Sequence, residues 1–248
     1  MKITDTIKDV FGTVLDSLFP KKCVSCGEIT EYGEDICASC RKELTFINNE
    51  KRCRFCGREE KFCECKKYVY RFSEILSVFE YSGPARQAMI RYKVLCRPYY
   101  ADFFVKHMAK TIVENYREIN FDAICYVPST IKSELKRGFN PPEVFAKKLS
   151  KLLLVPKYDV LFVAEKRESQ HKYKNNKEKR FENAAGKYAC NREMSGKTVL
   201  LIDDVMTTGA TLDDCTRALM FAGAERVYCV TALITVYHPK KLEKTEDS

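Results

Sequence analysis

Eight cysteines lie within one short segment and constrain the fold more than any other feature of this sequence. The chain has 13 cysteines, and eight of them form four close pairs, which are Cys23 and Cys26, Cys37 and Cys40, Cys53 and Cys56, and Cys63 and Cys65. Paired cysteines can direct their thiolates to one tetrahedral zinc ion. The segment has many charges and little apolar periodicity, so burial alone cannot give it a core. The pattern predicts a module held together by two structural zinc ions.

The way in which the four pairs combine stays open at this point. Sequential pairing makes one site from the first four cysteines and another from the last four, whereas crossed pairing would mix them. Redox chemistry of the thioredoxin type is the main alternative to zinc, but it needs one such pair in an α/β setting. We expect both zinc sites to be separate from the rest of the fold. With two zinc ions and eight thiolates, the formal charge falls from +9 to about +5, which is compatible with phosphate-rich ligands.

The two ends of the chain predict accessory segments. Residues 3–19 place their apolar side chains on one helical face, which predicts an amphipathic helix over residues 1–20. Its polar face carries Asp5, Asp9 and Asp16, and this acidity disfavours binding to an anionic membrane surface. The chain has neither a signal-peptide pattern nor an apolar run of membrane-spanning length, so we expect a cytoplasmic protein without a membrane partner. Residues 239–248 predict a disordered tail.

After residue 67 the pattern changes to strands that alternate with helices. Strands are predicted over residues 73–81, 122–127, 158–164, 198–202 and 226–234, and helices over residues 83–93, 99–116, 141–153 and 211–222. This alternation predicts an α/β fold with a mainly parallel sheet that is covered on both faces. We therefore expect four parts, which are the helix (1–20), the zinc module (21–67), the α/β domain (68–238) and the tail (239–248).

The stretch KTVLLIDDVMTTGATLDDC, residues 197–215, predicts an anion site beside two carboxylates. Residues 199–202 are apolar on both faces, as in a central parallel strand, so Asp203 and Asp204 come at the strand's carboxyl end, where such sheets bind ligands. The loop that follows is small and contains Gly209, and it leads into a helix whose amino terminus favours an anion. Because carboxylates repel phosphate, they must meet another part of the ligand. A ribose 5-phosphate with a substituent at its anomeric carbon satisfies both requirements.

Two alternatives to this interpretation follow from the same residues. A nucleotide triphosphatase is disfavoured because the pattern GxxxxGK[ST] is missing. An ordinary strand, loop and helix with Thr211 as the cap would need no ligand, but it leaves the order of the apolar strand, the two acids and the loop unexplained.

The stretch resembles the phosphoribosyl-pyrophosphate (PRPP) motif of type I phosphoribosyltransferases. With the four cysteine pairs, the chain resembles the ComF family of competence-associated proteins, in which a double zinc ribbon is joined to a phosphoribosyltransferase domain. The resemblance also rests on RYK (residues 91–93), KRGFN (136–140) and SQHKYKNNKEKRFEN (169–183). The chain departs from the family in its last cysteine pair, which is CxC, and in Pro141, where the family commonly has glutamine.

The resemblance implies roles for particular residues. Asp203 and Asp204 would bind the ribose hydroxyls with magnesium, and the 5-phosphate would be bound by Thr207, Thr208, Gly209, Ala210 and Thr211. The turn of residues 127–130, with Ser129, would hold pyrophosphate, and Arg137 lies nearby in the sequence. Residues 165–180 correspond to the mobile loop that closes over the reacting centre, although a basic loop is also commonly just solvated.

The function implied is that of a PRPP-binding, phosphoribosyltransferase-like protein that acts in DNA uptake and handles single-stranded DNA, alongside other proteins of the competence machinery. Residues 51–71 combine basic and aromatic side chains as a stacking groove would, and the candidates for nucleic-acid contact are Arg52, Arg54, Lys66 and Lys67. The aromatic residues could equally pack the ribbon on the core. The alternative function is an active phosphoribosyltransferase of nucleotide metabolism that releases pyrophosphate, in which the ribbons take the place of a substrate-binding hood.

Overall fold

The computed structural model describes residues 21–63, 65, 69–95, 97–164 and 186–236. Several sequence predictions fall outside these residues, namely the helix of residues 1–20, Lys66 and Lys67, the loop of residues 165–180 and the tail. In the described part of the chain, no helix combines the length and apolar character needed to cross a bilayer.

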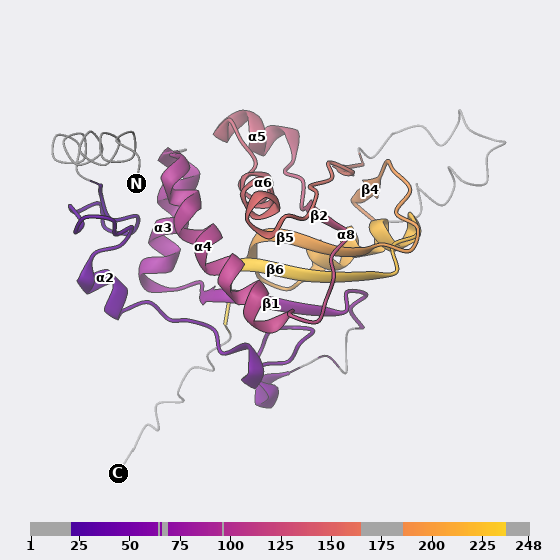
Figure 1. Cartoon of the computed structure of the whole chain (residues 1–248), viewed down its shortest axis with the longest axis horizontal. Coiled ribbons are helices and arrows are strands. Elements are labelled where there is room, and N and C mark those ends of the chain that lie inside the picture. The colour runs from indigo at the N-terminus through magenta and orange to yellow at the C-terminus, as the bar shows by residue number, and fades with distance from the viewer. Residues whose placement is uncertain (1–20, 64, 66–68, 96, 165–185, 237–248) are drawn as a thin grey trace, which may run out of the picture.

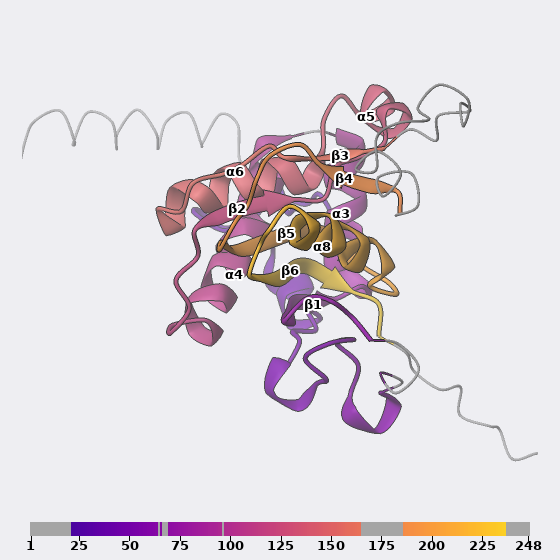
Figure 2. The same ribbon diagram turned by 90° about the vertical axis from the view of Figure 1, so that its right-hand side faces the viewer.

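A four-stranded parallel sheet forms the centre of the molecule (Figures 1 and 2). Its strands lie in the order β1 (Glu74–Glu80), β6 (Arg226–Ile234), β5 (Thr198–Met206) and β2 (Ala123–Tyr126). The two central strands are nearly continuous apolar runs because both of their faces are covered. The predicted α/β fold with a parallel sheet is confirmed.

Helices cover the sheet on both faces. On one face lie α3 (Gly83–Leu95), α4 (Pro98–Asn115) and α6 (Pro141–Leu153), which pack on Leu200 and Ile202. On the other face, α8 (Ala210–Phe221) and the small hairpin of β3 (Leu161–Val163) and β4 (Tyr188–Cys190) pack on Val199 and Leu201. The alternation of side chains along β5 thus divides the interior into two cores.

The structure differs from the sequence prediction at three places. The segment predicted as a strand over residues 158–164 gives only β3, which pairs with β4 in a separate antiparallel hairpin. A short helix that the sequence analysis missed, α5 (Ile131–Arg137), begins after Thr130, whose side chain caps it, and ends at Gly138 in the left-handed region. Strand β5 continues past Ile202 to Met206 because β6 pairs with it over its whole length.

The cysteine segment, residues 21–65, has few regular elements. It contains α2 (Ala38–Lys42) and two single 3-10 turns, η1 (Asn49–Lys51) and η2 (Glu60–Phe62). Each half is instead closed by turns, in which the amide N–H of Gly27 bonds to the carbonyl of Cys23, and that of Gly57 to the carbonyl of Cys53. Short turns and a five-residue helix are a weak scaffold by themselves, as expected for a segment that needs another constraint.

Candidate functional site

The eight paired cysteines form two compact clusters. The sulfur atoms of Cys23, Cys26, Cys37 and Cys40 lie within 4.8 Å of one another, and so do those of Cys53, Cys56, Cys63 and Cys65. The Sγ–Sγ separations are 3.7 Å between Cys26 and Cys37 and 3.5 Å between Cys53 and Cys65. Four thiolates around a zinc ion at about 2.3 Å would lie about 3.8 Å apart, so both clusters fit tetrahedral zinc. The structure groups the cysteines in chain order.

The two carboxylates of the PRPP-like motif lie where β2 no longer accompanies β5. Asp203 is buried, and its Oδ1 accepts a hydrogen bond of 2.8 Å from the amide of Asp204. The side chain of Asp204 is turned to the layer of α3 and lies 2.7 Å from Lys93 Nζ. Burial raises the pKa of Asp203 well above its ordinary value, and the carboxylate of Asp204 raises it further. A cation near this pair therefore stabilises its ionised form.

The loop after β5 is open to solvent and is shaped by Gly209. The side chains of Thr207, Thr208 and Ala210 are exposed, whereas Gly209 is buried with a φ of 81° and caps α8. A Cβ at this position would lie 3.0 Å from the ring of Tyr70. Glycine is therefore required both by the positive φ and by the close approach of Tyr70. The first turn of α8 then presents its amide groups to the exposed loop, as an anion site needs.

Family comparisons decide what these features belong to. A family model described as "Double zinc ribbon domain" matches residues 14–70, and one described as "Phosphoribosyl transferase domain" matches residues 140–248. The chain thus combines a segment that matches a double zinc ribbon, with its two cysteine clusters, and a segment that matches a phosphoribosyltransferase domain. With the two clusters, the ribbon match indicates two structural zinc ions.

Curated relatives of the chain bear competence-protein names. "Competence protein ComFC" of Bacillus subtilis is 26% identical over 200 residues, which span 77% of this chain and 80% of that protein. "Competence protein F" of Haemophilus influenzae is 23% identical over 85% of this chain and 96% of that protein. "Competence protein ComFC" of Streptococcus pneumoniae is 26% identical over 83% and 96%, respectively. The resemblance to the ComF family is confirmed, and the matches support a competence-related, phosphoribosyltransferase-like protein.

Two solved enzyme structures are also similar to the chain. Glutamine phosphoribosylpyrophosphate amidotransferase from B. subtilis has a TM-score of 0.39 at 17% identity, with 57% of this chain covered. The match spans only 30% of that enzyme. Purine phosphoribosyltransferase from Pyrococcus horikoshii has a TM-score of 0.35 at 17% identity, over 59% of this chain and 94% of that enzyme.

The zinc ribbons are not separate from the phosphoribosyltransferase domain, contrary to our expectation. In the second ribbon, a Cβ on Gly57 would lie 2.2 Å from Ile234 at the end of β6, and the carbonyl of Arg54 accepts a hydrogen bond from the amide of Ile75 in β1. The hydroxyl of Tyr70 then donates a 2.8 Å hydrogen bond to the carbonyl of Thr208 in the expected phosphate loop, residues 207–211. The second ribbon is thus joined to the loop itself.

The first zinc ribbon contacts the same domain from another side. Arg91 of α3 bonds through Nη1 to the carbonyl of Cys26, at 3.5 Å, and through Nε to the hydroxyl of Tyr100, at 3.2 Å. A Cβ on Gly27 would lie 2.6 Å from the guanidinium of Arg91, so only glycine leaves room for this contact. The last turn of α3 is therefore held against the first zinc knuckle.

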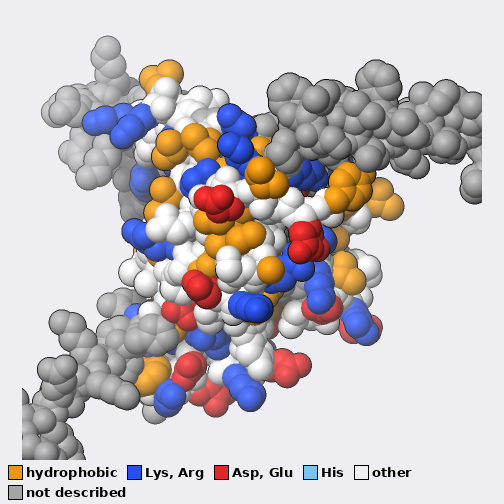
Figure 3. All heavy atoms as spheres, turned by 90° about the vertical axis from the view of Figure 1, so that its left-hand side faces the viewer, with side chains coloured by type: hydrophobic (Ala, Val, Ile, Leu, Met, Phe, Trp, Pro, Cys, Tyr) orange, Lys and Arg blue, Asp and Glu red, His pale blue; other side chains and the backbone are white. Residues whose placement is uncertain are grey.

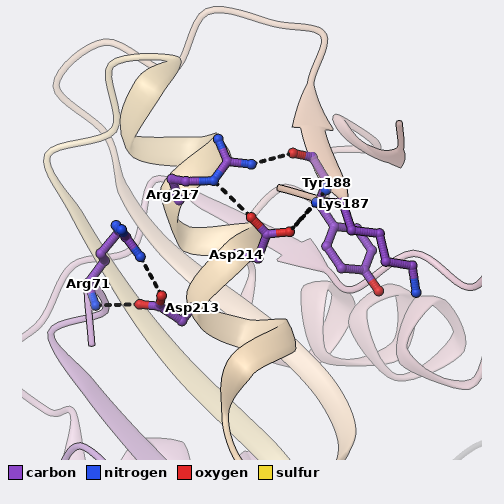
Figure 4. Close-up of polar contacts among 6 residues, drawn as sticks. All are labelled: Arg71, Lys187, Tyr188, Asp213, Asp214 and Arg217. Atoms are coloured by element: carbon purple, nitrogen blue, oxygen red, sulfur yellow. Dashed lines mark hydrogen bonds and ion pairs between the residues drawn. The ribbon is translucent and has the colours of Figure 1, made fainter. Parts of the chain in front are cut away.

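Two neighbouring acids near the start of α8, Asp213 and Asp214, fasten this part of the helix to its surroundings (Figure 4). Asp213 accepts a 2.6 Å hydrogen bond from the amide of Arg71 and pairs with its guanidinium. Asp214 points the other way and accepts hydrogen bonds from the amides of Lys187 and Tyr188, while it also pairs with Arg217. The start of α8 is therefore bonded to Arg71, which follows the second ribbon, on one side and to the β3–β4 hairpin on the other.

The expected pyrophosphate turn lies beside β5, because the amide of Val127 bonds to the carbonyl of Ile202. Nη2 of Arg137 donates a 3.1 Å hydrogen bond to Ser129 Oγ, which in turn donates to Asn140 Oδ1 at 2.9 Å. Asn140 is buried and also donates to the carbonyl of Val127. Asn140 was missed as a positioning residue, although it belongs to the quoted KRGFN motif.

Of the four basic residues proposed for nucleic-acid contact, Arg52 and Arg54 lie in the described part of the chain, and both have local partners. Nη1 of Arg52 donates to the carbonyl of Gly57 inside the second ribbon, and Arg54 lies over the ring of Phe55 at 5.1 Å. Tyr70 stacks on the buried Phe72 with ring centroids 5.0 Å apart. Of the two roles considered for the aromatic residues, stacking on bases and packing on the core, Tyr70 has the packing role.

Proposed function

We propose that this protein binds PRPP, with the ribose hydroxyls at Asp203 and Asp204 and the 5-phosphate in the loop of residues 207–211. The observation that carries the proposal is the convergence of four features at one edge of the sheet, which are the two acids, the glycine-capped loop, the Ser129 turn and Arg137. The acids and the loop occupy one strand and its exit, as the two ends of a ribose 5-phosphate require.

In this proposal the protein supplies position and charge. The guanidinium of Arg137, held on Ser129, would meet the pyrophosphate, and the exposed amides at the start of α8 would bind the 5-phosphate. The carboxylates of Asp203 and Asp204 have the oxygen ligands that magnesium prefers, and the bound ion would neutralise charge on PRPP. A cytoplasmic location is part of the proposal because eight thiolates must stay reduced to hold zinc.

Isothermal titration of PRPP with magnesium tests this assignment. The double change Asp203→Asn with Asp204→Asn should weaken PRPP binding by two or more decades, because each charge-assisted hydrogen bond contributes roughly 1.5–3 kcal/mol. Asp102→Asn is the matched control, since Asp102 forms an exposed pair with Lys148 on the helices α4 and α6. Unchanged affinity in a folded double variant would refute the ribose site.

We further propose that the protein handles single-stranded DNA through residues 51–71. The competence-protein names of its relatives support this role, as does the basic and aromatic composition of the segment. Figure 3 shows one face of the molecule, on which Lys and Arg side chains are interspersed with acids and apolar groups. Such a mixed face suits a phosphate backbone poorly.

Anisotropy titrations at two salt concentrations test the DNA proposal. Single strands should bind better than duplex, because exposed bases can stack on aromatic rings, and affinity should fall steeply with salt. Lys66→Glu with Lys67→Glu should impair DNA binding and leave PRPP binding intact. Absence of binding at low salt would contradict the proposal and favour a protein partner for the ribbons.

A second candidate function is an active phosphoribosyltransferase. The Ser129, Arg137 and Asn140 network favours it, because an ordered cation beside the pyrophosphate turn would stabilise a departing pyrophosphate. Incubation with PRPP and magnesium across a panel of bases and amines should then release pyrophosphate, and Arg137→Met should abolish that release.

A further inference from the structure

The last turn of α3 places three consecutive side chains in three different environments. Arg91 bonds to the first zinc knuckle and to Tyr100. Tyr92 is buried, and its ring meets those of Phe139 at 5.1 Å and Phe145 at 5.5 Å. Lys93 reaches Asp204, with Nζ 2.7 Å from Oδ2. The RYK motif thus fixes the backbone of α3 through its first two residues and leaves the third as a cation at the two acids.

The position of Lys93 matters because it competes with any other cation at the same carboxylate. The side chains of Lys93 and Asp204 are 29% and 14% exposed, so solvent screens their attraction only in part. Asp203, the preceding residue, is buried, so the ammonium group occupies the more accessible of the two carboxylates. Two adjacent carboxylates without such a neighbour would attract a divalent ion by themselves.

A lysine side chain can also leave this position without any movement of α3. Its four-carbon stem is flexible, whereas the helix behind it is held by Arg91 and Tyr92. The phosphates of an incoming ligand offer the ammonium group a new partner, and their arrival would release Asp204. A site built in this way accepts the divalent ion together with its anionic ligand rather than before it.

We propose that Lys93 is a positioning residue that occupies Asp204 in the ligand-free protein and makes divalent-cation binding at the two acids depend on the arrival of PRPP. The inference rests on the proposed PRPP function. In this view, Lys93 determines whether the divalent cation binds before PRPP or together with it, which is a property separate from affinity for the ribose.

Titration with Mn²⁺ in the absence of PRPP, followed by the electron paramagnetic resonance signal of the free ion, tests the proposal. Lys93→Met keeps most of the stem and removes the charge, and it should raise Mn²⁺ affinity about tenfold or more, equal to at least about 1.4 kcal/mol. Lys93→Arg keeps the charge and should behave like the wild type. Lys148→Met removes another paired lysine, on α6, and should change nothing.

The added Asp204→Asn change shows whether the gained site is the expected one. In the Lys93→Met background it should abolish the gain in Mn²⁺ affinity, whereas a gain that survives would place the ion elsewhere and overturn the proposal. Equal Mn²⁺ affinity of Lys93→Met and the wild type, with both folded by circular dichroism, would overturn it as well. A wild type that binds no PRPP at saturating magnesium would refute the proposed function instead, and the two failures are distinguishable because the Mn²⁺ titration contains no PRPP.

Discussion

At the scale of single residues, Gly209 and Tyr70 together determine the shape of the phosphate loop. The ring of Tyr70 lies against Gly209, and its hydroxyl holds the carbonyl of Thr208. Behind the ring, Phe72 is buried in the core below α8. The loop therefore packs against the aromatic pair of Tyr70 and Phe72. This contact keeps the backbone amides of the loop in place before any ligand arrives.

Gly209→Ala should disturb this loop more than backbone strain alone explains. The new Cβ would face both a φ of 81° and atoms of Tyr70 and Met206 at 3.0 and 2.8 Å. Gly196→Ala is the matched control, because its φ is 68° and a Cβ there meets nothing within 4 Å. We expect the control to lose about 1–2 kcal/mol of unfolding free energy in urea and to keep PRPP affinity. Gly209→Ala should lose more stability and most of its PRPP affinity, and equal behaviour of the two variants would contradict this account.

At the scale of secondary-structure elements, Asp213 and Asp214 near the start of α8 fasten two parts of the chain that are far apart in sequence. Asp214→Ala removes the acceptor of the Lys187 and Tyr188 amides and should speed their hydrogen exchange about thirtyfold, as expected for the loss of about 2 kcal/mol. Asp213→Ala should instead speed exchange at Arg71. The two variants serve as controls for each other, and a uniform increase over the whole chain would show that the bonds are not local.

The packing of His107, on helix α4, against a cluster of phenylalanine rings makes the stability of the fold depend on pH. Its ring packs against Phe46, Phe79 and Phe103. Burial, together with the nearby charges of Lys106, Lys110 and Arg41, lowers the pKa of His107 to about 4. Because this pKa is below that of the unfolded chain, the neutral ring contributes stability above about pH 6.5, and this contribution is lost as the pH falls towards 4.

Urea unfolding at pH 7 and pH 5 measures the effect. The wild type should lose about 1–2 kcal/mol more than His107→Gln over this interval, because the unfolded chain binds the additional proton. The comparison between the two proteins removes the pH-dependent change in unfolding free energy that they share, including the part that comes from the cysteines. Identical pH profiles would show that the ring is protonated without cost in the folded state.

Many elements could be predicted from the sequence, since their signals are local. Helix α6 agrees with its prediction at both ends because Pro141 and Pro142 begin it and an apolar period runs to Leu153. Strand β4 was missed since three residues carry no readable period. The partner of Lys93 could not be found because Asp204 is distant in the sequence, and the pair exists only because α3 lies across the end of β5. Contacts of this kind follow from the fold and not from spacing.

At the scale of the whole molecule, the two zinc ribbons contact the proposed PRPP site from two directions. The first acts through Cys26, Arg91 and the end of α3, and the second through Tyr70 and the phosphate loop. A cavity of about 440 Å³ lies between the second cluster and the loop, and its walls include Cys56, Cys65, Thr208 and Ala210. Zinc at the second cluster should therefore influence PRPP binding.

Cys53→Ser should release one of two zinc ions and weaken PRPP binding about tenfold, in the range usual for energetic coupling between sites. The physical reason is that the ribbon would no longer hold Tyr70 and Arg71 against the loop. Metal analysis and PRPP titration of the same sample measure both effects. Cys190→Ser, the same chemical change outside the clusters, should alter neither. Loss of both ions, or unchanged PRPP affinity after loss of one, would contradict this coupling.

The position of β1 in the sheet also has a consequence for synthesis of the chain. Strand β1 pairs within the sheet only with β6, the last of the described strands, so its partner leaves the ribosome after most of the chain has been made. The zinc ribbons depend on contacts close in sequence and can form while translation continues. Residues 45–47 bond to β1 on one side, but until residues 226–234 emerge its other edge lacks a partner and is prone to aggregate. Premature termination before β6 should therefore yield a product with folded ribbons and an insoluble remainder.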